Sequence, residues 1–219
     1  MNRVLDDLVK NAASSGFNTT SYGENVEDKV YGLLQCRGDV SPQDCSKISQ
    51  EAIITIQQLC VNAMGSRLWL DACFLGYDNF SFFSDFDAHV KHILFNPQTV
   101  KDNPGDFRNE VVDLLQSLKD KAFNVTSKGF ALGSTTSSSS DMHKVFGLVD
   151  CWRDLSLEQC RSCLSIALLN LYNITMQEGA EALLGNCRVR FETRPFSPLF
   201  ASNGSTPQIS PSNSQNQFL

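Results

Sequence analysis

Residues 30–45 read VYGLLQCRGDVSPQDC, and residues 145–160 read VFGLVDCWRDLSLEQC. The second stretch repeats the glycine, an aspartate, the serine and both cysteines of the first, each 115 positions later. The segment around Cys187 then matches the segment around Cys73 after a shift of one residue. A repeat of this extent indicates two tandem copies of one domain. The 219 residues are enough for two domains of about 100 residues, each able to bury a modest core.

Both copies carry the same local signals. An apolar run, residues 30–34 and again 145–149, predicts a buried strand that ends at a cysteine. Ser41 and Ser156 then stand where a helix N-cap is expected. A second amphipathic helix is expected before each strand, at residues 4–14 and 107–122. These elements predict an α+β fold of two small domains, each with two helices packed on an antiparallel sheet.

Cysteines and sequons together indicate the secretory route, where disulfides persist. Eight cysteines stand in two groups of four, with none between residues 74 and 150. Five Asn-x-Ser/Thr sequons without a middle proline are candidate glycosylation sites. They are Asn18, Asn79, Asn124, Asn173 and Asn203. Three of these, Asn18, Asn124 and Asn203, lie in polar segments that suggest accessible loops.

Other functions are disfavoured by what the sequence lacks. A net charge of −6 without a cluster of Lys and Arg disfavours nucleic acid as a partner. The pair Cys160-x2-Cys163 is at most half a zinc site, so we expect no metal and no cofactor. The three histidines lie outside any nucleophile motif, so we expect no enzymatic activity. The sequence contains no apolar run of membrane-spanning length. We expect no adhesion role for the tripeptide Arg37-Gly38-Asp39, because the repeat has Trp152-Arg153-Asp154 at the equivalent positions and a turn explains the polar residues without a partner.

The organisation of the chain follows from the repeat. Copy two has the segment 88–104 before its first helix, whereas copy one has almost nothing, and the N-terminal MNRVLDD is unlike a signal peptide. We therefore expect that a signal peptide and one strand of copy one lie upstream of Met1. The expected parts are domain 1 at 1–83, a linker at 84–87, domain 2 at 88–196, and a disordered tail, rich in Ser, Asn and Pro, at 197–219.

The tandem pattern Cys36-x8-Cys45 and Cys151-x8-Cys160-x2-Cys163 resembles the plant ginkbilobin-like (stress-antifungal) domain. That domain occurs in cysteine-rich repeat secretory proteins and in the ectodomains of cysteine-rich receptor-like kinases. The resemblance implies a sheet of about five strands and two helices per domain. It also implies the disulfides Cys36–Cys45, Cys151–Cys160 and Cys163–Cys187.

Two cysteines of copy one have no partner in this family pattern. Ile48 stands where copy two has Cys163, so Cys73 loses the partner that the family implies. The implied partner of Cys60 would precede Met1. We therefore expect Cys60 and Cys73 to be thiols or to form a substitute bridge with each other.

A sugar site is also implied by the resemblance, because some members bind mannose. Its residues are an Asn near the first strand, an Arg six residues before the last Cys, and an acidic residue five after it. Copy one offers Arg67 and Asp78, and copy two offers Asn96 and Glu192, with Glu181 in place of the Arg. We expect mannose binding to be weak or absent, and any surviving site to depend on Arg67 and Asp78. Alternatively, Arg67 and Asp78 form only a surface pair across a strand.

The function implied is that of a secreted, apoplastic protein that binds an extracellular protein or carbohydrate in plant defence or stress signalling. Two alternatives stay open. In the first, the chain is the truncated ectodomain of a cysteine-rich receptor-like kinase, and residues 197–219 are the spacer before a membrane span. In the second, the chain is an extracellular thiol redox sensor that uses Cys60 or Cys73.

Overall fold

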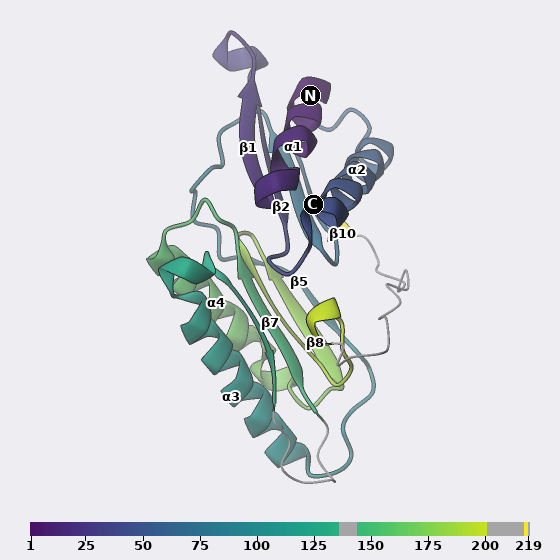
Figure 1. Ribbon diagram of the computed structural model, residues 1–219, viewed down its shortest axis with the longest axis vertical. Helices are drawn as coiled ribbons and strands as arrows, with labels where there is room; N and C mark the ends of the chain where they lie inside the picture. Colours follow the sequence, from purple (N-terminus) through teal and green to yellow (C-terminus); the bar gives the residue numbers. More distant parts are fainter. Residues whose placement is uncertain (136–143, 201–216, 219) are drawn as a thin grey trace. The chain divides into compact units, whose positions relative to one another are not determined.

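The computed structural model describes residues 1–135, 144–200 and 217–218. The chain divides into two compact units, Met1–Asp85 with Ser210–Leu219, and Phe86–Ile209. Each unit holds one five-stranded antiparallel sheet with two long helices on one of its faces (Figure 1). The α+β class expected from the repeat is thereby confirmed.

Unit 1 has the strand order β1-β2-β4-β3-β10. Helices α1 and α2 pack on one face of this sheet and against each other. The elements are α1 (Asn2–Ser15), β1 (Phe17–Tyr22), η1 (Val26–Asp28), β2 (Val30–Cys36), α2 (Pro42–Leu59), β3 (Ser66–Trp69), β4 (Cys73–Asp78) and β10 (Gln217–Phe218).

Unit 2 has the strand order β5-β8-β9-β7-β6. Its helices α3 and α4 cover one face of the sheet (Figure 1). The elements are β5 (Val90–Phe95), α3 (Pro104–Ala122), η2 (Val125–Ser127), β6 (Phe130–Ser134), β7 (Phe146–Cys151), α4 (Leu157–Leu171), η3 (Tyr172–Ile174), β8 (Gly179–Leu184), β9 (Cys187–Glu192) and η4 (Pro198–Phe200).

The two sheets are copies of one another. Strands β1, β2, β4 and β3 of unit 1 correspond in order and pairing to β6, β7, β9 and β8 of unit 2. Beyond β8 lies β5, whereas the matching position beyond β3 is taken by the two-residue strand β10. Strand β5 begins within the segment 88–104 that has no counterpart at the start of copy one.

The repeated serines cap the second helix of each unit, as their positions predict. The side chain of Ser41 accepts a hydrogen bond from Asp44 N at 3.1 Å, with Pro42 in the first turn. At Ser156 the capping box is complete, because its hydroxyl accepts from Gln159 N and the Gln159 side chain accepts from Ser156 N. Each cap satisfies backbone N–H groups that the helix itself leaves without partners.

The repeated glycine lets the first helix of each unit approach the sheet. A Cβ at Gly32 would collide with Val4 and Leu8 of α1, and a Cβ at Gly147 would lie 2.9 Å from Leu118 of α3. Only glycine allows this close approach without displacing the helix. The core of each unit fills the layer between its helices and its sheet.

The start of the expected tail is ordered in the second unit, contrary to the sequence expectation. Pro198–Phe200 form the short helix η4, and Ser197 is buried. The Phe200 ring packs edge-on against Phe146 and Phe196, at centroid distances of 4.7 and 5.4 Å. Most of the remaining tail lies outside the described residues.

Candidate functional site

Side chains alternate between the two faces of each sheet along its strands. One face packs against the helices. The other, which we call the outer face, carries a set of polar and aromatic residues. Gly32 faces α1, so Tyr31 next to it points to the outer face. Asp78 is paired with Tyr31 across β2 and β4, and therefore shares that face. The same reasoning places Phe146 and Glu192 on the outer face of unit 2.

In unit 1 the outer face carries an arginine–carboxylate pair between β3 and β4. Arg67 Nη2 lies 3.2 Å from Asp78 Oδ2, and Arg67 Nη1 donates to the Tyr77 carbonyl at 2.7 Å. The guanidinium carbon is 3.9 Å from the centroid of the Phe82 ring. Gly76 makes room for the arginine, because a Cβ there would lie 2.8 Å from Arg67 Cδ. Arg67 and Asp78 are therefore brought together, as both interpretations of the sequence required.

Unit 2 carries an equivalent pair built from a different arginine. Arg190 contacts Glu192 Oε1 through Nε at 3.1 Å and through Nη2 at 3.0 Å. Its guanidinium carbon lies 4.5 Å from the centroid of the Phe196 ring. Both ion pairs are about four-fifths buried. Each unit thus has one arginine that pairs with a carboxylate and stacks on a phenylalanine, which we call the Arg–carboxylate–Phe cluster.

The arginine of this cluster has changed strands between the two copies. Arg67 comes from β3, whereas Arg190 comes from β9, the counterpart of β4. Glu181 of β8 takes the place of Arg67 and is paired in register with Arg190. A second cation also faces Glu181, whose Oε1 lies 3.7 Å from Arg188 Nη1. Copy two therefore does have cations beside its carboxylates, although Glu181 stands where copy one has Arg67.

Asn96 lies at the end of β5, two strands from Glu192. Its backbone N–H donates to the Gly179 carbonyl at 2.8 Å, and Gly179 is in turn paired with Glu192. The Glu192 carboxylate leans over Gly179, where a Cβ would collide with it. The Asn96 side-chain oxygen accepts from Gln98 N at 3.0 Å. Asn96 and Glu192 thus occupy one row of the sheet, with only a glycine between them.

An aromatic ring and a lysine flank each cluster. Tyr31 lies opposite Asp78 and Phe146 opposite Glu192. The Lys29 ammonium is 5.5 Å from the Tyr31 ring centroid, and the Lys144 ammonium is 5.3 Å from that of Phe146. Within the described chain each site therefore contains an arginine, a carboxylate, a phenylalanine, a second aromatic ring and a lysine.

The residues missed by sequence reasoning had a detectable signal. Phe82 and Phe196 are separated by the same 114 positions as Asp78 and Glu192, and Lys29 and Lys144 by the 115 positions of the first half of the repeat. Arg190 lies two residues before Glu192 and so on the same face of its strand.

The disulfides of the structure are Cys36–Cys45, Cys151–Cys160 and Cys163–Cys187, the pairs that the family resemblance implies. Cys60 and Cys73 are thiols and do not form the substitute bridge. Cys60 Sγ lies 3.0 Å from Ser66 Oγ on the helix side of the sheet. Burial, together with nearby Cys60 and Asp78, raises the pKa of Tyr77, whose hydroxyl donates to the Ala63 carbonyl.

The adhesion-like tripeptide is closed on itself. Arg37 Nε and Nη2 contact the two carboxylate oxygens of Asp39 at 2.5 and 2.8 Å, and Arg37 Nη1 donates to the Asp71 carbonyl. Both side chains of the pair are almost completely buried. Neither charge is presented to a partner in this arrangement, which supports the interpretation of the tripeptide as a turn.

Sequons differ in their accessibility. Asn79, Asn124 and Asn173 are exposed. Asn18 instead lies within β1, is partly buried, and donates its amide to the Asp7 carbonyl at 3.3 Å. The expectation of an accessible loop at Asn18 is therefore wrong, because residues 17–22 form strand β1, which their pattern did not predict. Asn203 lies outside the described residues.

Comparisons with known proteins agree with this architecture. Residues 1–80 and 95–194 match a family described as salt stress response/antifungal. An antimicrobial ginkbilobin-2-like protein of Castanea crenata is 36% identical over 197 residues, which are 90% of this chain and 80% of that protein. Cysteine-rich repeat secretory protein 55 of Arabidopsis thaliana is 36% identical over 196 residues, 88% of this chain and 74% of that protein.

A solved structure shows the same tandem fold. The tandem DUF26 ectodomain of the Arabidopsis thaliana cysteine-rich receptor-like protein PDLP8 superimposes with a TM-score of 0.76 at 27% identity, over 87% of each chain. None of the helices in the described ranges is both long and apolar enough to cross a membrane.

Proposed function

Because the chain belongs to the salt stress response/antifungal family, we propose that it is an extracellular recognition protein that binds saccharides through the Arg–carboxylate–Phe cluster of each unit. The protein is extracellular, as its secretory relatives and the matching ectodomain are. Its three disulfides suit the oxidising conditions found there. We propose a role in binding rather than catalysis, in plant defence or stress signalling.

The observation that carries this proposal is the presence of the cluster in both copies although its arginine comes from different strands. If the ion pair served packing alone, a change in the strand that supplies the arginine would not require the carboxylate and the phenylalanine to stay beside it. Together these groups supply hydrogen-bond donors, acceptors and an apolar ring face, the combination that a sugar ring with hydroxyls on its edge requires.

Single sugars should bind weakly. In each cluster the guanidinium and the carboxylate already satisfy one another, so a sugar hydroxyl must compete with a charged hydrogen bond of about 1.5–3 kcal/mol. Two sites on one chain can nevertheless engage a single polymer, and avidity then raises the apparent affinity without new contacts. We therefore expect the protein to bind mannan more strongly than it binds mannose.

Retention on mannan beads tests the proposal. The Arg67→Ala and Arg190→Ala variants should each lose most of the retention, because each leaves one functional site. Arg194→Ala is the matched control, since Arg194 is exposed and follows Glu192 by two residues. Retention of the double Arg67→Ala, Arg190→Ala variant at the level of the wild type would refute the assignment of the clusters.

A further inference from the structure

Unit 1 holds a third cysteine directly beside a disulfide. Cys36 at the end of β2 is paired in register with Cys73 at the start of β4. Cys36 is bonded to Cys45 in the first turn of α2, while Cys73 remains a thiol. In unit 2 the matching cysteines, Cys151 and Cys187, are each held in a bridge of their own.

The backbone hydrogen bonds define how close Cys36 and Cys73 come. Cys36 N donates to the Gly16 carbonyl, away from β4, and the next residue, Arg37, donates to the Ala72 carbonyl across β4. Cys36 and Cys73 are therefore a non-hydrogen-bonded pair, in which the Cα atoms lie about 4.5 Å apart and the side chains share one face. That separation falls within the range of roughly 4.4–6.8 Å that a disulfide spans.

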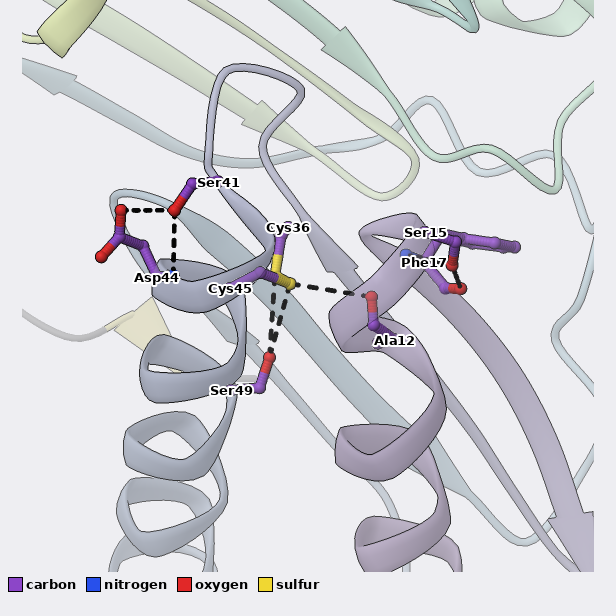
Figure 2. Close-up of a disulfide and its surroundings, with 8 residues drawn as sticks. All are labelled: Ala12, Ser15, Phe17, Cys36, Ser41, Asp44, Cys45 and Ser49. Carbon is purple, nitrogen blue, oxygen red and sulfur yellow. Dashed lines mark hydrogen bonds between the residues drawn. A yellow bond between two sulfur atoms is a disulfide. The ribbon is translucent and has the colours of Figure 1, made fainter.

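Ser49 gives this arrangement a second feature that unit 2 lacks. Its buried hydroxyl lies 3.6 Å from Cys36 Sγ and 3.9 Å from Cys45 Sγ, as Figure 2 shows. Bridged sulfurs carry no proton, so the hydroxyl is the donor. The position 115 residues later is Leu164, just as Cys163 stands where unit 1 has Ile48. Compared with α4 of unit 2, helix α2 of unit 1 therefore lacks the bridging cysteine at position 48 and carries a hydroxyl at the adjacent position 49.

We propose that Cys73 and the Cys36–Cys45 bridge form a thiol–disulfide exchange site. Cys73 is buried, so its thiol loses its proton to solvent during a local opening of the unit, and the thiolate attacks Cys36 Sγ. A Cys36–Cys73 bond forms while the Cys36–Cys45 bond breaks, and the electron pair leaves on Cys45 Sγ, which then takes up a proton. One disulfide and one thiol are present before and after, so no oxidant or reductant is consumed.

The released cysteine has partners in place. The Ser49 hydroxyl can donate to the Cys45 thiolate as it forms. In the bridged state Cys45 Sγ lies 3.9 Å from the Ala12 carbonyl of α1 (Figure 2). A protonated Cys45 at this place can donate a hydrogen bond to that carbonyl. The exchange replaces the covalent link between β2 and α2 by a link between β2 and β4. Helix α2 is then held only by non-covalent packing, so the exchange state sets how firmly it is anchored.

Thiol mapping of the full chain in a Cys60→Ser background tests this proposal. The protein is held at pH 8 without added thiol or oxidant, quenched in acid, alkylated with N-ethylmaleimide in acidic denaturant, and mapped without reduction. We expect the label to divide with time between Cys73 and Cys45, faster by up to about tenfold per pH unit below the thiol pKa. Label that stays on Cys73 alone, or that moves to Cys36, would overturn the proposal.

Two further variants separate exchange from general loosening of the fold. Ser49→Ala should slow the exchange by about tenfold, the value of one hydrogen bond to a charged group, and an unchanged rate would remove Ser49 from the site. Ile48→Cys supplies the counterpart of Cys163, which should bridge Cys73 and leave Cys45 unlabelled. The four cysteines of unit 2 should stay unlabelled throughout, and labelling there together with Cys45 would contradict local exchange.

Discussion

Single residues decide what each copy of the repeat can do, and Arg190 is the clearest case. A rule that counts six positions back from the last cysteine finds Arg67 in copy one and the wrong charge, Glu181, in copy two. The structure restores a cation by placing Arg190 on the neighbouring strand beside Glu192. The family's spacing rule missed this because it tests a single position on β8, whereas the two-residue spacing of Arg190 and Glu192 on β9 places both side chains on one face.

Removal of the carboxylate in unit 1 separates a binding role from a structural one. Asp78→Asn keeps the shape of the side chain but removes the counter-charge of Arg67, and the pair is about four-fifths buried. We expect the unfolding free energy to fall by about 1.5–3 kcal/mol, the value of one hydrogen bond to a charged group, while retention on mannan decreases. Urea unfolding and bead retention measure the two effects. A loss of several kcal/mol with retention unchanged would show that the pair serves stability alone.

At the scale of the element, the second helix of each unit was predictable where its start is encoded locally. Ser41 and Ser156 cap α2 and α4 as their neighbours indicate. Strands β1 and β3 were not foreseen, since FNTTSY and SRLW are short and lack a clear alternation of apolar and polar residues. Their place in the sheet is set by pairing with β2 and β4, which is tertiary information.

Loss of a cap should have a measurable cost. Ser156→Ala removes the acceptor for Gln159 N, and we expect unit 2 to lose about 1 kcal/mol of stability. The matched control is Ser165→Ala, because the Ser165 hydroxyl only bonds to the Arg161 carbonyl within the same helix. Chemical denaturation followed by circular dichroism compares the two variants. Equal effects would mean that the capping box contributes nothing specific.

A bridge restored in unit 1 should stabilise it. Ile48→Cys places a thiol at the position that in unit 2 bonds Cys187, the counterpart of Cys73. The new loop has nearly the length of the one closed by Cys163–Cys187, so we expect a gain of about 2–3 kcal/mol after the loss of isoleucine packing is included. The oxidised variant is compared with the oxidised Ile48→Ser variant by chemical denaturation, because reduction would also open the three native bridges. No difference between the two variants would indicate that the new bridge does not form or does not constrain the unfolded chain.

For the molecule as a whole, the repeat with its cysteines and sequons led correctly to a tandem, extracellular protein. Which sequons are accessible required the structure, because Asn18 belongs to a strand. We expect N-glycans at two or more of Asn79, Asn124 and Asn173, whose side chains are exposed. Glycosidase treatment of protein secreted from plant cells, followed by peptide mass analysis, locates them. An unchanged mass would contradict passage through the secretory route.

The central claim is that both units carry a saccharide site of the same kind, and an NMR titration with methyl mannoside tests it most directly. We predict two separate groups of shifting amides, one around Arg67 and Asp78 and one around Arg190 and Glu192, both with millimolar affinity. Arg67→Ala should abolish only the first group and Arg190→Ala only the second. Shifts elsewhere in the chain, or shifts at these residues that persist in the double variant, would contradict the account.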